Sequence, residues 1–134
     1  MPKYANVRKQ FNDAMELFKE KNYPAAEEEF FKITDTDKKL PSDCSILSSL
    51  YYCLSSAASG DTRSFQDIED ICYDDKDLDA LQPKYLRKFM ADFKEVLSSV
   101  FDYKNHGNEF DETVRWYNDL VSNRLKGDGA DLLL

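Results

Sequence analysis

The sequence predicts an all-α protein of about six helices, arranged as three antiparallel hairpins. Apolar residues recur at three- and four-residue steps along most of the chain, which is the spacing of one buried helix face. No segment keeps the period of two that marks a strand, because aromatic runs such as Phe30-Phe31 and Tyr51-Tyr52 lie inside helical patterns. The hairpins begin about every forty residues, the spacing of stacked helical arrays, while a compact bundle without repetition is the alternative.

Residues 11–33 read FNDAMELFKEKNYPAAEEEFFKI and predict the first hairpin. The helical spacing breaks before Pro24, and proline suits the first turn of a new helix because its missing N–H is not needed there. Two small residues, Ala14 and Ala26, stand among the aromatic residues of this stretch. Small side chains let paired helices approach closely, so we expect both alanines at the contact between the two helices.

Turn residues delimit the later helices. Ser42 can cap a helix that closes near Gly60, a further hairpin begins near Pro83, and the turn-like residues 106–108 divide that hairpin. The last helix should end at Gly127, because glycine readily adopts the left-handed conformation of a helix cap. The apolar residues that these helices should bury are Ile46, Leu47, Leu50, Tyr51, Leu54, Phe65, Ile68, Ile71, Cys72, Tyr85, Leu86, Phe89, Phe93, Val96, Leu97, Val100, Phe110, Val114, Trp116 or Tyr117, and Leu120.

Length and charge bound the domain count and the class of partner. The chain has 134 residues, of which 42% are hydrophobic and 13% aromatic, enough to bury a core without help from a metal or a disulfide. We expect a single helical domain over residues 1–127 and a C-terminal tail over 128–134. The net charge of −8 opposes attraction to nucleic acid or to an anionic membrane and favours basic partner segments instead.

Cysteine usage and hydropathy indicate the compartment. Cys44, Cys53 and Cys72 form no CxxC pair and lie in apolar helical patterns, so they should be reduced thiols that pack as small hydrophobic residues. The start of the chain has no apolar run of signal-peptide length, and no stretch approaches the roughly 20 apolar residues of a membrane span. We therefore expect a soluble, cytoplasmic protein that does not insert into a membrane.

One short motif resembles the start of a calcium-binding loop. Asp75, Asp77 and Asp79 stand at alternate positions, as do the first ligands of an EF-hand. The sixth position is Ala80 rather than glycine, and the twelfth is Leu86 rather than the glutamate that closes the site. We expect a solvated acidic loop here, and neither a metal nor another cofactor.

No residue pattern nominates a catalytic centre. His106 is the only histidine and lies in a turn-like run, where nothing local supplies the nucleophile or the orienting acid of a triad. Glycine is too scarce for a phosphate-binding loop. We expect a protein that is not an enzyme, although separated residues can also assemble into an active site.

Residues 7–38 resemble a tetratricopeptide repeat. This family places small, large, tyrosine, alanine and aromatic residues in a set order along a helical hairpin. The sequence departs from the pattern at Gln10, where the family usually has tryptophan, and at Ile33, where it usually has alanine. The later hairpins keep the character of the motif but not its spacing. The residues that carry the resemblance are Ala14, Leu17, Tyr23, Ala26 and Phe30.

The resemblance implies a binding groove, because tetratricopeptide-like proteins commonly hold an extended peptide or a partner helix on their concave face. It implies that Arg8, Phe11, Asn12, Met15 and Lys19 look toward this groove. Arg8 and Asn12 would bond a peptide backbone or carboxylate, and Phe11 with Met15 would form an apolar floor. Chaperone-binding members have a lysine and an asparagine where this chain has Phe11 and Met15, so their carboxylate clamp is absent here.

Later in the chain the candidate partner-binding residues are Tyr52, Lys84 and Lys88. The two lysines share a helix face with Arg87 nearby, so an anionic side chain or peptide terminus could bind across them. Pairing of these cations with neighbouring acids is the alternative.

Acidic clusters and the tail each allow two interpretations. The runs Glu27-Glu28-Glu29 and Asp67-Glu69-Asp70 indicate solvated helix faces, with docking patches as the alternative. The three terminal leucines should pack on the last hairpin or be disordered, with docking into another chain as the alternative.

Three functions are compatible with the sequence. The favoured one is a non-enzymatic adaptor that binds a peptide or helix of a partner protein through the concave face of the array. The second is a structural subunit whose apolar surface is permanently covered in a larger complex. The third is an enzyme whose site is assembled from separated residues.

Overall fold

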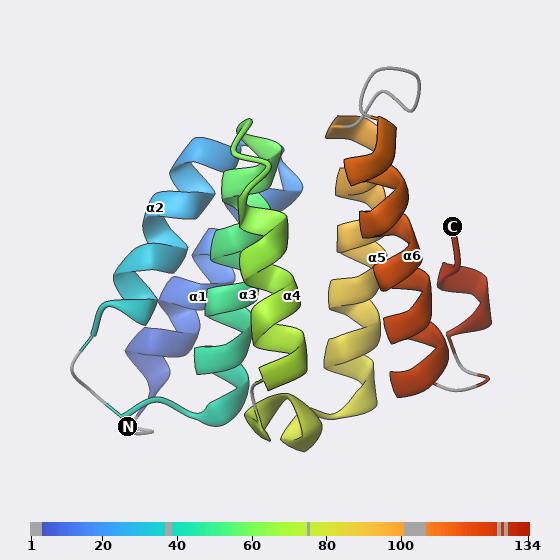
Figure 1. Cartoon of the computed structure of the whole chain (residues 1–134). Helices are drawn as coiled ribbons and strands as arrows, with labels where there is room; N and C mark the ends of the chain where they lie inside the picture. Colours follow the sequence, from blue (N-terminus) through green and yellow to red (C-terminus); the bar gives the residue numbers. More distant parts are fainter. Residues whose placement is uncertain (1–3, 37–38, 75, 101–106, 126, 128) are drawn as a thin grey trace. The chain divides into compact units, whose positions relative to one another are not determined.

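The computed structural model describes residues 4–36, 39–74, 76–100, 107–125, 127 and 129–134, and its regular secondary structure is entirely helical in these residues (Figure 1). The predicted all-α fold is therefore confirmed. Within the same residues there are six α-helices and two short 3-10 helices. Their bounds are α1 (Ala5–Lys19), α2 (Tyr23–Thr34), α3 (Ser42–Ala58), α4 (Ser64–Asp74), η1 (Lys76–Ala80), α5 (Pro83–Val100), α6 (Gly107–Arg124) and η2 (Ala130–Leu132).

Contacts between the helices divide the chain into two compact units, which we call unit 1 (Met1–Leu81) and unit 2 (Gln82–Leu134). Unit 1 contains α1 to α4 and η1, and unit 2 contains α5, α6 and η2. In unit 1, α1 packs on α2, α2 on α3, and α3 on α4, while α1 also touches α3 (Figure 1). Helix α3 therefore has α1 and α2 on one side and α4 on the other.

The turn between α1 and α2 is closed by backbone hydrogen bonds. Lys21 has a φ of 64°, and its N–H donates to the Phe18 carbonyl oxygen at 3.0 Å. The N–H of Asn22 donates to the Leu17 carbonyl oxygen, also at 3.0 Å. This pair of bonds with one left-handed residue is the Schellman arrangement, and it satisfies carbonyl groups that the end of a helix would otherwise leave unpaired. Pro24 lies in the first turn of α2, as predicted.

The end of α3 repeats this arrangement with a glycine. Gly60 has a φ of 119° and donates its N–H to the Ala57 carbonyl oxygen, while the N–H of Asp61 donates to that of Ser56. At the other end of α3 the predicted cap is wrong. Ser42 is the first helical residue, and Pro41 holds the capping position without any side-chain cap bond, its carbonyl accepting the first helical hydrogen bond.

The core of unit 1 is built around the ring of Tyr51. Its centroid lies 5.3 Å from that of Phe18, 5.5 Å from that of Phe30 and 6.4 Å from that of Phe11. Rings at these separations, in edge-to-face or offset geometry, attract each other beyond the gain from burial alone. This aromatic cluster therefore ties α1, α2 and α3 together.

Small and apolar residues fill the remaining core largely as predicted. Ala14 and Ala26 are fully buried, as the close approach of α1 and α2 requires. The apolar residues expected on buried helix faces are buried, with a few exceptions. The exceptions, which are only half-buried, are Ile71, Tyr85, Val100 and Val114.

Unit 2 is held by a second aromatic cluster and a buried hydroxyl. The ring centroid of Phe93 on α5 lies 5.7 Å from that of Trp116 and 5.5 Å from that of Tyr117, both on α6. The Tyr117 hydroxyl donates to the Leu132 carbonyl oxygen at 2.8 Å and also lies 3.0 Å from the Met90 carbonyl oxygen. One buried hydroxyl therefore joins α5, α6 and the C-terminal residues.

Residues 129–134, which we call the terminal segment, pack on the α5–α6 hairpin. The Arg87 guanidinium lies 2.8 Å from the Asp131 carboxylate, and the Lys94 ammonium donates to the Leu133 carbonyl oxygen at 3.1 Å. Leu132 is buried, whereas the Leu133 side chain is exposed. Of the placements predicted for the terminal leucines, packing on the last hairpin is the one found.

Two glycines guide the chain from α6 into the terminal segment. Gly127 has a φ of 65°, the left-handed conformation predicted for it, although α6 itself ends at Arg124. Gly129 passes close to α6, and a Cβ added there would lie 2.7 Å from Leu125 Cβ and 2.9 Å from Val121 Cγ1. Only a residue without a side chain fits at this approach.

Candidate functional site

The predicted groove residues of α1 divide into exposed polar and covered apolar side chains. Arg8, Asn12 and Lys19 are exposed, whereas Phe11 is half-buried and Met15 is only 7% exposed. Phe11 packs against aromatic rings of α2 and α3. The two residues expected to form an apolar floor therefore contribute mainly to the core of unit 1.

We call the five predicted groove residues of α1 the α1 face. Both of its cations, Arg8 and Lys19, have acidic partners within unit 1. The Arg8 guanidinium nitrogens lie 3.2 and 3.4 Å from the two carboxylate oxygens of Asp43, in the first turn of α3. The Lys19 ammonium lies 3.4 Å from the Glu16 carboxylate. Exposed pairs of this kind are weak, about 0–1 kcal/mol each, so a ligand can displace them but must compete with them.

The basic residues of α5 also have partners within their own unit. The Lys88 ammonium lies 3.3 Å from the Asp92 carboxylate, and the Lys84 ammonium lies 5.0 Å from the centre of the Tyr85 ring. With Arg87 bound to Asp131, the alternative of intramolecular pairing is the one found for Arg87 and Lys88.

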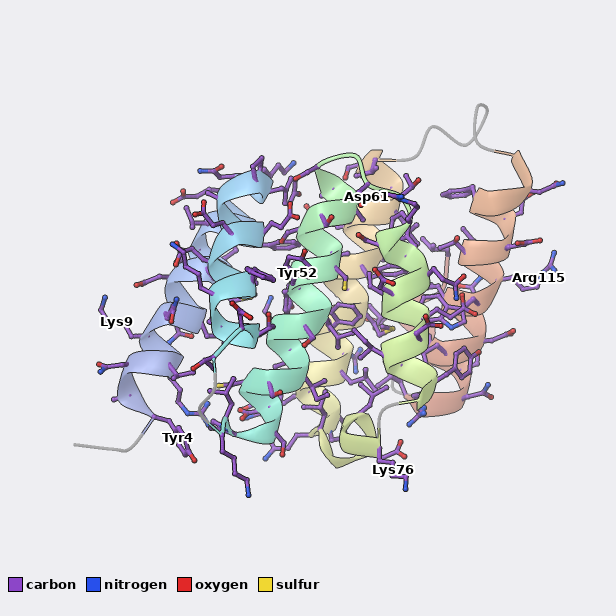
Figure 2. All side chains as sticks on the ribbon, turned by 60° about the vertical axis from the view of Figure 1, so that its left-hand side comes forward. Tyr4, Lys9, Tyr52, Asp61, Lys76 and Arg115 are labelled. Atoms are coloured by element: carbon purple, nitrogen blue, oxygen red, sulfur yellow. The ribbon has the colours of Figure 1, made fainter. Side chains whose placement is uncertain are left out.

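Tyr52 lies beside an aromatic residue that was not among the predicted site residues. The ring centroids of Phe31 on α2 and Tyr52 on α3 are 5.6 Å apart, with their planes inclined at 41°. Tyr52 is half-buried, whereas 47% of Phe31 is exposed. Figure 2 shows Tyr52 between α2 and α3, on the side of unit 1 that faces the viewer. We call Phe31 and Tyr52 the aromatic pair.

Helical spacing explains why Phe31 is exposed. Its neighbours Phe30 and Ile33 are buried in the core, and an adjacent helical position is rotated by about 100° from Phe30. Phe31 therefore lies on an outer face of α2, where a polar residue would not impair folding of the protein. A large apolar residue outside the buried period was the signal in the sequence that could have identified it.

Two acidic residues, one on α2 and one on α4, lie near the aromatic pair. Glu27 lies one turn before Phe31 on the same face of α2, and Asp67 lies in the first turn of α4. The pKa of Tyr52 is raised above its usual value, first by burial and then by the negative charge of Glu27, with smaller effects from Asp67 and Asp61 among others. These carboxylates are therefore within electrostatic reach of the Tyr52 hydroxyl.

The cationic residue next to Phe31 in the sequence, Lys32, does not pair with Glu27 or Asp67. Lys32 pairs with Glu29 at 3.1 Å and with Glu28 at 3.7 Å. Glu27 and Asp67 form no ion pair or hydrogen bond within the described part of the chain. Two carboxylates beside the aromatic pair thus keep uncompensated negative charge.

Two buried thiols, those of Cys53 and Cys44, are protonated near neutral pH. Burial, followed by the charges of Asp67 and Glu27, raises the pKa of the Cys53 thiol to about 12. Burial is also the main cause that raises the pKa of Cys44. Since the thiolate is the nucleophilic form, neither group is an activated nucleophile.

No group of three or more metal-binding side chains occurs among the residues that the structure describes. Of the predicted calcium-like motif, Asp75 and the side chains of Asp77 and Ala80 lie outside these residues, as does His106. In the described ranges, none of the helices has the length and apolar character needed to cross a bilayer.

The resemblance of residues 7–38 to a tetratricopeptide repeat stays a prediction. Comparison of the chain with protein-family models, with curated proteins and with solved structures gave no match.

Proposed function

We propose that the chain is a non-enzymatic protein-interaction adaptor that binds a segment of a partner protein at the aromatic pair of unit 1. The observation that carries this proposal is the exposure of Phe31, nearly half of whose surface faces solvent while its ring rests against Tyr52. Aromatic side chains are enriched at protein interfaces, where they gain apolar contact area at a low cost in conformational entropy.

The aromatic pair has a rigid base, which favours binding. Phe30 and Ile33 anchor α2 in the core on either side of Phe31, and Tyr51 does the same for α3 beside Tyr52. A ring held in place by its helix loses little further freedom when a partner covers it. The surface is thus organised before any partner arrives.

The α1 face is the second candidate surface for the same function. Asn12 is exposed there between Arg8 and Lys19. We rank it below the aromatic pair because both of its cations have partners and its apolar residues are covered.

We infer a cytoplasmic setting for this function. Cys44, Cys53 and Cys72 are buried and form no disulfide with one another in the described residues. Free thiols of this kind suit a reducing compartment. A multiprotein complex is a natural place for such an adaptor.

The test compares two surfaces on one protein. The immobilised chain and its Phe31→Ser and Asn12→Ala variants are exposed to extract from the source cells, after circular dichroism has shown equal helicity. We expect proteins identified by mass spectrometry to be retained by the original chain and by Asn12→Ala, and lost by Phe31→Ser. Loss with Asn12→Ala alone would move binding to the α1 face, and equal retention by both variants would contradict binding at either surface.

A further inference from the structure

The charges around the aromatic pair specify the chemistry of its partner. Helix α3 contacts both α2 and α4, and the charges of Glu27 on α2 and Asp67 on α4 both act on the Tyr52 hydroxyl. Neither acid has a cationic partner within the described ranges, and the base next to Phe31 is engaged by Glu28 and Glu29. The surface therefore combines an exposed ring with unneutralised negative charge from two helices.

Resting on the adaptor function proposed above, we propose that the partner segment carries an arginine or lysine whose cationic side chain lies on the rings of Phe31 and Tyr52 and pairs with Glu27 and Asp67. A cation over an aromatic face is attracted by the negative charge of the ring surface. Arginine suits the site better than lysine, because its planar guanidinium stacks on a ring and bonds a carboxylate through two N–H groups at once.

The Tyr52 hydroxyl adds a polar contact to this surface. It has no hydrogen-bond partner among residues that the structure describes. A hydroxyl both donates and accepts, so it can bond the backbone of a bound segment next to the cationic side chain. Burial first, and then the negative charge of Glu27, raise the pKa of Tyr52 above its usual value, so the hydroxyl is protonated and can donate at neutral pH.

Other occupants fit less well. An acidic or phosphorylated segment would be repelled by Glu27 and Asp67 and by the net charge of −8. A second copy of the chain would place the same two carboxylates opposite each other around the rings. A cationic segment gains from every group of the surface.

The experiment uses a random library of peptides of about 12 residues, displayed and selected on the intact chain. Peptides that also bind the Phe31→Ser variant are removed by counter-selection. We expect the remaining peptides to be enriched in arginine or lysine next to an apolar residue. One such peptide is then synthesised, and its dissociation constant is measured by fluorescence anisotropy.

A charge-matched pair of variants tests the two carboxylates. We expect Glu27→Gln with Asp67→Asn to weaken binding of the peptide about ten-fold, whereas Glu16→Gln on α1 with Glu20→Gln directly after the helix leaves binding within about two-fold. An equal loss in both double variants would overturn the inference, because the peptide would then respond to net charge alone.

The outcomes separate this inference from the proposed function. Enriched peptides that need Phe31 but lack a cation would overturn the cationic partner and leave the adaptor function standing. No peptide that depends on Phe31 would overturn both. A light-scattering mass of a dimer that reverts to the monomer in Phe31→Ser would assign the surface to a second copy and overturn the cationic partner.

Discussion

The Tyr117 hydroxyl lies in the interior of unit 2, where it donates to the Leu132 carbonyl oxygen and lies 3.0 Å from the Met90 carbonyl oxygen. We expect Tyr117→Phe to lower the free energy of unfolding by about 1–2 kcal/mol, because the buried carbonyl groups lose their partner without gaining water. Urea denaturation followed by circular dichroism measures the change. The matched control is Tyr85→Phe in the same unit, which is half-buried and should change stability by less than about 0.5 kcal/mol. Equal stability of Tyr117→Phe and the original chain would contradict this role.

A buried thiol and a buried phenol make the stability of the protein depend on alkaline pH. Burial raises the pKa of Cys53 from 9.0 to about 12, and burial is also the main cause that raises the pKa of Tyr117 above 10.0. Above about pH 9 the unfolded chain releases protons that the folded chain retains, so stability is full below this pH and falls as pH rises toward 12. We expect a lower urea midpoint at about pH 10.5 than at about pH 8, with a smaller decrease in Cys53→Ala. A decrease of the same size in that variant would exclude the thiol as a cause.

At the scale of single residues, part of the candidate site could be predicted from the sequence. Tyr52 was identified as a partner-binding residue, whereas Phe31 was assigned to a helical aromatic run without regard to its outer face. The acids Glu27 and Asp67 were interpreted as parts of solvated faces. Periodicity identifies residues that face the core, but it does not tell which outer residues of different helices meet, since that depends on how the helices pack.

The close packing of α1 on α2 depends on two residues with small side chains. Ala14 and Ala26 are fully buried, so a larger side chain would force the helices apart or into strained rotamers. We expect Ala14→Leu and Ala26→Leu each to lower the free energy of unfolding by about 1–3 kcal/mol in urea titrations. The exposed Ala91 of α5 provides the control, since leucine there meets no packed neighbour. Unchanged stability of both buried variants would show that the helices tolerate a wider spacing.

Helix ends were predicted correctly where a proline or glycine marks them, and wrongly where a capping side chain was expected. Pro24 and Gly60 have steric preferences that act whatever surrounds them, and both stand where expected, in the first turn of α2 and directly after α3. Ser42 was predicted to cap α3, but a capping side chain competes with other ways of entering a helix. Here Pro41 provides the extended residue before the helix, with a ψ of 141°.

Unit 1 should fold without the rest of the chain. The rings of Phe11 and Phe18 on α1 and of Phe30 on α2 pack against Tyr51 on α3, and all four lie within residues 1–81. We expect a fragment of residues 1–81 to be helical and to unfold cooperatively on heating, as followed by circular dichroism. The isolated fragment should also bind the selected cationic peptide. A broad, non-cooperative melt would show that this unit depends on residues beyond 81.

The division into two units was not predicted from the sequence, which indicated one helical domain over residues 1–127. Apolar spacing is similar in all the predicted helices and does not say which of them share contacts. The fold class was easier to predict, because the sequence lacks the two-residue period of half-buried strands and keeps helical spacing along most of the chain.

Because Gly129 has no side chain, the chain can pass close to Leu125 and Val121 of unit 2 at this residue. Gly129→Ala keeps every polar group of unit 2 and has no unfavourable φ, yet its methyl group would meet Leu125 and Val121 at less than contact distance. We expect this substitution to lift residues 130–134 from the α5–α6 hairpin and to increase amide hydrogen exchange at Leu132 and Leu134. Exchange rates equal to those of the original chain would contradict this effect. A single methyl group would thus detach the end of the chain from unit 2, while every side chain that binds residues 130–134 stays in the protein.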